Sequence, residues 1–171
     1  CMSCPDDKIK AIDQLHIVPV AVSYEWESCD ILKTLELYES QFAKYTKKPG
    51  EDLNSILTGI SQPKGRVHIE ICEPISRMEL MKLEQLTSNE YHKAVAHLLD
   101  ERINKAYRLY PNNYIAYDLR YGTRKYQDFY TPQQKEEFLA HVRELEHYDT
   151  CDIEMLKDIY LGIYANPVNN K

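Results

Sequence analysis

The chain has 171 residues, 43% of them hydrophobic and 28% charged, so it can bury a sizeable core and we expect a single unit over residues 1–171. Its net charge of −6 argues against binding to nucleic acid, which needs concentrated lysine and arginine. The sequence contains no apolar run long enough to cross a membrane.

Five cysteines, an odd number, are scattered along the chain, which favours a reducing compartment such as the cytoplasm. Cys1-Met-Ser-Cys4 has the spacing of half a zinc site or of a redox pair. A structural zinc ion needs four ligands, and no second close pair of Cys or His follows at finger spacing. We therefore expect no metal and no bound cofactor.

The first predicted element is a strand in His16-Ile-Val-Pro-Val-Ala-Val-Ser-Tyr24, a short apolar and β-branched run. The run over Ile17–Val22 is typical of a strand buried on both faces, inside a mainly parallel sheet. Only one other segment is a convincing strand, and an isolated pair of strands is marginally stable in water. We therefore expect the chain to be the C-terminal part of a larger α/β protein.

Two helices are predicted next. The first begins at a cap formed by Ser28 or Asp30 and ends near Pro49-Gly50. The second covers Glu51 to Ile60 and starts with two acidic residues, as the helix dipole favours. Its apolar face consists of Leu53, Ile56, Leu57 and Ile60.

A turn at Gln62–Gly65 leads into a second strand, Arg66 to Glu73, in which Val67, Ile69 and Ile71 share one face. Residues 1–75 thus form a strand-helix-helix-strand segment. We expect a βαβ arrangement with a right-handed crossover.

Residues 76–171 are predicted to form a helical extension. A long amphipathic helix runs from about Asn89 to Tyr110 and is stopped by Pro111. A capping box at Thr131 starts a helix to about His147, and a last helix covers Asp152 to Ala165, before Pro167. The expected fold class is α/β, mostly helical, with a βαβ-type C-terminal part of a larger sheet followed by this extension.

Tyrosine is unusually frequent, with eight of the 14 tyrosines between Tyr91 and Tyr130. A platform for stacking bases would combine aromatic rings with a basic groove, whereas acidic residues are interspersed here. We favour packing of a helix-loop-helix corner by Tyr107, Tyr110, Tyr114, Tyr117 and Tyr121.

Three segments together resemble a known family: Ile17-Val-Pro-Val20, Lys64-Gly-Arg-Val-His-Ile69 and Glu73-Pro-Ile75. Their order and spacing are similar to the C-terminal half of the 1-acyl-glycerol-3-phosphate acyltransferases, and the longer agreement, from Leu15 to the end, is similar to a bacterial glycerol acyltransferase-like subgroup. The resemblance implies transfer of a fatty acyl group from an acyl thioester, acyl-CoA or acyl carrier protein, to a glycerol-phosphate or lysophospholipid acceptor.

The family's catalytic motifs, H-x-x-x-x-D and one resembling F-P-E-G-x-R-S, precede the I-V-P-V block, and only about 16 residues precede it here. The string His147-Tyr-Asp-Thr-Cys-Asp152 matches the first motif, but it falls near the C-terminus across a predicted helix end and cap. We therefore expect no catalytic residue in this chain. The partners implied are an N-terminal catalytic half of the same protein, a phospholipid precursor and the inner face of the membrane as a peripheral contact.

Six residues are candidates for substrate binding. By resemblance, Ile17, Val18, Pro19 and Val20 help to line the acyl or acceptor cleft. Lys64 and Arg66 flank Gly65 and offer positive charge to a phosphate, although a solvated turn explains them equally well. Lys44, Lys47 and Lys48 extend this charge toward a basic patch for anionic lipid.

Three hypotheses follow from the sequence. In the first, the chain is the C-terminal region of a phospholipid-pathway acyltransferase. In the second, it is a non-catalytic helical module of the same ancestry that binds a partner protein through its tyrosines. In the third, it is an enzyme that uses His147 and Asp152 directly. We favour the first.

Overall fold

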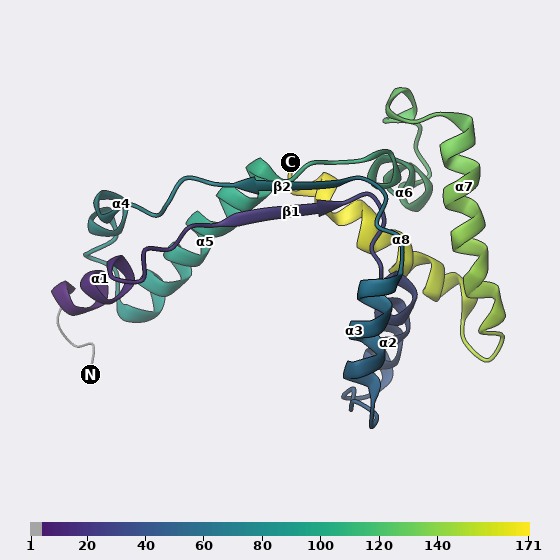
Figure 1. The fold of residues 1–171 in the computed structure, drawn as a ribbon, viewed down its shortest axis with the longest axis horizontal. Helices are drawn as coiled ribbons and strands as arrows, with labels where there is room; N and C mark the ends of the chain where they lie inside the picture. The colour runs from purple at the N-terminus through teal and green to yellow at the C-terminus, as the bar shows by residue number, and fades with distance from the viewer. Residues whose placement is uncertain (1–4) are drawn as a thin grey trace. The chain divides into compact units, whose positions relative to one another are not determined.

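The computed structural model describes residues 5–171, so Cys1 and Cys4, the spacing of which suggested half a metal or redox site, lie outside the described residues. The chain is mostly helical with a small sheet, as the expected class requires (Figure 1). Its elements in order are α1 (Pro5–Asp13), β1 (Val20–Tyr24), α2 (Asp30–Phe42), α3 (Glu51–Ser61), β2 (Val67–Ile71), α4 (Arg77–Lys82), α5 (Ser88–Ala106), α6 (Pro111–Tyr121), α7 (Pro132–Arg143) and α8 (Ile153–Asn169). Short 3-10 turns occupy Gln127–Phe129 and Glu144–His147.

The described chain forms two compact units. Unit 1 contains residues 5–23 and 68–108, and unit 2 contains residues 24–67 and 109–171. Both strands carry the chain from one unit into the other. The boundaries between the units fall after Ser23 in β1 and after Val67 in β2, and not at residue 75, where the predicted helical extension begins.

β1 and β2 lie side by side and run in opposite directions (Figure 1). The expected parallel βαβ crossover is therefore wrong. The helical hairpin α2–α3 joins the two strands and returns the chain beside the strand it left, which makes the pair antiparallel. Within residues 5–171 the sheet has only these two strands.

Unit 1 is built on α5. Its core consists of Ile9, Ile75, Leu80, Tyr91 and Val95, contributed by α1, the segment after β2, α4 and α5. The α5 residues of this set, Tyr91 and Val95, lie about one turn apart on the buried side of the helix, and only Val95 belongs to the predicted amphipathic stripe. The helix α1, which the sequence did not predict, supplies Ile9 to this core.

Unit 2 is a helical cluster in which α8 packs against α6 and α2. Its core contains Ile115, Ala116, Phe138, Val142, Leu145, Leu156, Tyr160, Tyr164 and Ala165. Phe138, Tyr160 and Tyr164 form a buried aromatic group, with the rings of Phe138 and Tyr164 edge to face at 5.3 Å.

Two prolines have positions that differ from the sequence prediction. Pro111 opens α6 instead of ending the preceding helix, which already stops at Ala106, because the fixed φ of proline suits a first turn. The Tyr110 N–H is capped there by the Asn113 side chain at 2.8 Å. Pro167 lies inside α8, where its missing N–H removes one helical bond near the end while Ala165 and Val168 stay buried.

The first turn of α4 gives a stability prediction that depends on pH. Glu79 accepts hydrogen bonds from the backbone N–H (2.9 Å) and the hydroxyl (2.7 Å) of Ser76, and Arg102 donates to it at 2.6 Å. The bonds from Ser76, followed by Arg102, lower the pKa of Glu79 from 4.5 to about 2.

Because the folded carboxyl has the lower pKa, its contribution to stability is complete above pH 4.5 and is lost as the pH falls toward about 2. We expect Glu79→Gln to lower the free energy of unfolding by about 1 kcal/mol at neutral pH, as other cap substitutions do. Urea unfolding at several pH values measures the difference in free energy of unfolding between the unaltered chain and Glu79→Gln. A difference that stays constant as the pH falls from 7 toward about 2 would contradict the prediction.

Candidate functional site

The sheet exposes one apolar face. The bonds from Glu25 N–H to the Arg66 carbonyl (3.0 Å) and from Cys72 N–H to the Pro19 carbonyl (2.9 Å) fix the antiparallel register. In this register Val20 lies opposite Ile71 and Val22 lies opposite Ile69, on the same face. These four side chains are 46%, 74%, 38% and 64% exposed, respectively. We call them the apolar ladder.

The other face of the sheet is covered by the α5 segment. Ser23 accepts a hydrogen bond from the Arg108 N–H at 2.9 Å, and the Cys72 thiol donates to the Arg102 carbonyl at 3.8 Å. Ala21 and Ser23 are fully buried on this side. The prediction of a strand buried on both faces is therefore wrong, because the described residues of unit 1 cover one face only.

The four residues of the I-V-P-V block divide between the two faces. Ile17 packs against the core of unit 1 and Pro19 is buried, whereas Val18 and Val20 are exposed. The strand itself begins at Val20, later than predicted, although the Ile17 carbonyl still accepts a bond from the Ile75 N–H at 3.0 Å. Only Val18 and Val20 of this block are thus placed to meet a ligand.

The two cationic candidates both have partners within the chain. Lys64 donates to the carbonyls of Gly59 (2.6 Å) and Gln62 (3.1 Å), at the C-terminal end of α3. Arg66 forms a two-pronged ion pair with Glu25 at 2.8 and 3.1 Å. Hydrogen bonding to Arg66 lowers the pKa of Glu25, and the positive charge of Arg66 lowers it further. Both cations therefore stabilise the turn.

Gly65 is required by this turn. Its φ of +61° is in the left-handed region. A Cβ at this position would lie 2.7 Å from the Glu25 carboxylate and 3.1 Å from the Trp26 ring. Replacing Gly65 would therefore disturb the Glu25–Arg66 pair and the position of Trp26 together.

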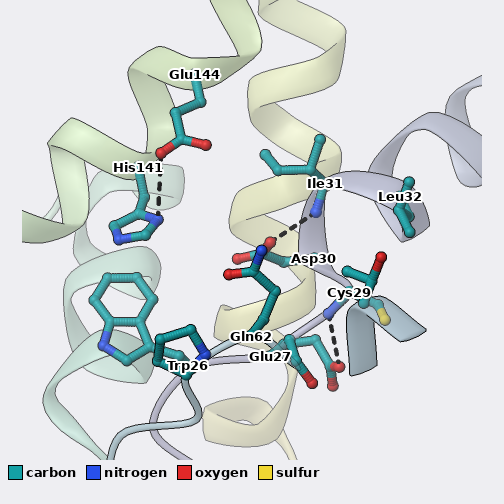
Figure 2. Close-up of a pocket in the computed structure, with 12 residues that line it drawn as sticks. Trp26, Glu27, Cys29, Asp30, Ile31, Leu32, Gln62, His141 and Glu144 are labelled. Atoms are coloured by element: carbon teal, nitrogen blue, oxygen red, sulfur yellow. Dashed lines mark hydrogen bonds and ion pairs between the residues drawn. The ribbon is translucent and has the colours of Figure 1, made fainter. Parts of the chain in front are cut away.

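A pocket in unit 2 lies beside this turn (Figure 2). It has a volume of about 440 Å³ and is formed by the segment leading into α2, the end of α3 and the end of α7. Its lining residues are Trp26, Glu27, Ser28, Cys29, Asp30, Ile31, Leu32, Thr58, Gln62, Pro63, His141 and Glu144. This pocket was not predicted from the sequence, although the single tryptophan of the chain, two residues after β1, was a signal for it.

Asp30 anchors one wall of the pocket. Its carboxylate accepts hydrogen bonds from the hydroxyls of Tyr160 (2.8 Å) and Tyr164 (2.7 Å), both on α8. The Tyr164 hydroxyl in turn accepts a bond from the Glu27 N–H at 3.0 Å. Burial raises the pKa of both tyrosines, which therefore remain protonated donors. The expected cap at Ser28 or Asp30 is wrong: the cap residue is Cys29, and Asp30 ties α2 to α8.

The remaining polar groups of the pocket suit binding better than thiol catalysis. Burial, together with the charges of Glu27 and Asp30, raises the pKa of the Cys29 thiol, which donates to the Ser55 carbonyl at 3.5 Å. A protonated thiol is a poor nucleophile. The His141 ring packs on Trp26 with 4.3 Å between centroids, so the pocket offers an aromatic wall and three carboxylates.

His147 and Asp152 are not arranged as a catalytic dyad. His147 ends the 3-10 turn after α7, while Asp152 caps α8 by accepting a bond from the Met155 N–H at 3.1 Å. The predicted helix end and cap are confirmed. Among the side chains of residues 8–171, no group of three or more His, Cys, Asp or Glu is arranged to hold a metal ion.

A comparison with known proteins finds no matching family model, no matching curated sequence and no matching solved structure. No helix in the described part of the chain is both long and apolar enough to cross a membrane.

The bonds of Asp30 predict a large cost for its removal. In Asp30→Ala, two buried tyrosine hydroxyls lose their acceptor, and we expect the free energy of unfolding to fall by about 3 kcal/mol. The matched control is Asp158→Ala, also in unit 2, which removes only an exposed partner of Arg120 and costs about 1 kcal/mol or less. Urea unfolding followed by tyrosine and tryptophan fluorescence measures both, and equal losses would contradict the anchoring role.

Proposed function

We propose that this chain is the C-terminal region of an acyltransferase that moves a fatty acyl group from an acyl thioester to a glycerol-phosphate or lysophospholipid acceptor. In this proposal the chain supplies one wall of the cleft. The histidine and aspartate that carry out the reaction belong to a catalytic half outside this chain, so the chain alone does not catalyse transfer. The reaction takes place on the cytoplasmic side of a membrane, with acyl-CoA or acyl carrier protein as donor.

The observation that carries the proposal is the apolar ladder. Its strand β1 contains the end of the I-V-P-V block, which in the resembling family follows the catalytic motifs. Val20 and Val22 of β1 and Ile69 and Ile71 of β2 form a flat, β-branched surface. A surface of this kind suits an extended hydrocarbon chain, because contact is lengthwise and needs no polar partner.

Of the two cationic candidates, both in unit 2, Arg66 is the better one for binding a phosphate group. Its side chain is 59% exposed in spite of the pairing with Glu25, whereas the amine of Lys64 is held by two carbonyls. Glu25 is only 17% exposed and also accepts a hydrogen bond from the Arg66 N–H at 3.0 Å, so this pair is not a freely exchanging surface pair. A phosphate would therefore meet the exposed side of the Arg66 guanidinium while the pair with Glu25 is kept.

A second candidate function is binding of a partner protein, and one aromatic cluster favours it. Tyr114 lies 4.6 Å from Phe129 and 5.1 Å from Tyr126, measured between ring centroids. Lys125 lies over the Tyr126 ring at 4.8 Å. Phe129 is 56% exposed, and exposed aromatic groups of this kind are common at protein interfaces.

Binding of palmitoyl-CoA to the chain tests the first candidate. We expect Ile69→Asp, which places a charge at the centre of the apolar ladder, to weaken binding about tenfold or more. Met78→Asp is the matched control, since Met78 is an exposed apolar residue of the same unit outside the ladder, at 73% exposure. Equilibrium dialysis with labelled palmitoyl-CoA measures both affinities. Equal affinities of the two variants, or no binding by the unaltered chain, would contradict the cleft-wall role.

A further inference from the structure

The helix α3 has its apolar side turned away from the protein. Leu53, Ile56, Leu57 and Ile60 recur at helical spacing on one face, and they are 61%, 58%, 57% and 75% exposed. No residue of α3 is fully buried. The apolar face that the sequence predicts is therefore present, and it is exposed. We call them the α3 ridge.

The opposite side of α3 makes the contacts with the rest of unit 2, and the residues in these contacts are small or polar. The Ser55 carbonyl accepts from the Cys29 thiol, and the Gly59 carbonyl accepts from the Lys64 amine. Gly59 itself lies against Cys29, with 3.7 Å between the thiol sulfur and the position a Cβ would occupy. The order of burial on this helix is thus the reverse of that on an ordinary surface helix, which packs its apolar face inward.

The area and chemistry of the ridge argue against a second copy of the chain as its occupant. Four aliphatic side chains at this exposure present about 500 Å², whereas a stable interface needs about 800 Å² from each partner. The ridge also lacks the aromatic and arginine side chains that anchor most protein interfaces. An area of this size is sufficient for reversible contact with lipid, in which the partner is apolar and deformable.

The charge around the ridge complements an anionic surface. The loop before α3, residues 43–50, contains three lysines and no acidic side chain, within a chain of net charge −6. Lys44, Lys47 and Lys48 are exposed in the loop directly before α3. Lys47 pairs with Asp52 at 2.6 Å and Lys48 with Glu39 at 3.6 Å, and both pairs are exposed enough to exchange partners. Phe42, at 68% exposure, adds an aromatic side chain at the end of α2.

We propose that the α2–α3 hairpin binds the surface of a membrane containing anionic lipids. The α3 ridge lies among the upper parts of the acyl chains, and the lysines of the preceding loop contact the headgroups. The helix lies in the interface and does not cross the membrane. This proposal does not rest on the proposed acyl transfer, because it needs neither an acyl donor nor an acceptor.

Co-sedimentation with vesicles tests the proposal. The probe is vesicles of equal parts phosphatidylcholine and phosphatidylglycerol, compared with vesicles of phosphatidylcholine alone. We expect binding to the anionic vesicles, weaker binding to the neutral ones, and a loss of about tenfold or more in Ile56→Asp. Asn54→Asp is the matched control, since it adds the same charge to an exposed position of α3 outside the ridge and should reduce binding by about twofold or less.

Circular dichroism of both variants confirms that α3 is retained, and Leu57→Ser provides a second ridge variant without added charge. Three results would overturn the proposal: no binding of the unaltered chain to anionic vesicles, equal binding of Ile56→Asp and Asn54→Asp, or a dimer in light scattering that Ile56→Asp dissociates. None of these results depends on palmitoyl-CoA binding at the apolar ladder. Loss of palmitoyl-CoA binding would contradict the proposed function and leave the membrane proposal unaffected.

Discussion

The register between β1 and β2 decides which side chains of this chain are covered and which are exposed. With Glu25 opposite Arg66 and Pro19 opposite Cys72, alternate residues of both strands face α5, and the residues between them form the apolar ladder. A slip of one residue would exchange the two faces. The same register brings Glu25 to Arg66, and their ion pair joins the two ends of the segment that carries α2 and α3.

Several elements followed directly from local sequence. The start of α3 at Glu51, the alternating strand β2 and the capping box at Thr131 were correct because each depends on neighbouring residues only. The antiparallel pairing, the anchoring of Asp30 by Tyr160 and Tyr164, and the pocket beside Trp26 depend on residues far apart in the chain. Spacing along one segment carries no information on such contacts.

β1 was expected to be buried on both faces, and the reason why this expectation is wrong also explains the exposed face of α3. Periodicity shows which residues of a helix or strand share a face, and it grouped Leu53 with Ile56 and Ile69 with Ile71 correctly. It does not show whether anything covers that face. In α3 and in the β1–β2 sheet the grouped apolar side chains are exposed, and in both places the covered side is made by small or polar residues such as Ser23 and Gly59. The two proposals assign these surfaces to an acyl chain and to a lipid membrane.

The central claim is that the apolar ladder forms part of an acyl-binding cleft, and photolabelling tests it most directly. Palmitoyl-CoA with a diazirine in its acyl chain is bound to the protein and irradiated, and the labelled residues are identified by mass spectrometry of peptides. The account predicts that the label is concentrated on residues 18–22 and 69–71 and is displaced by unlabelled palmitoyl-CoA. Label that is absent there, or that lies mainly on other residues and is displaced in the same way, would contradict it.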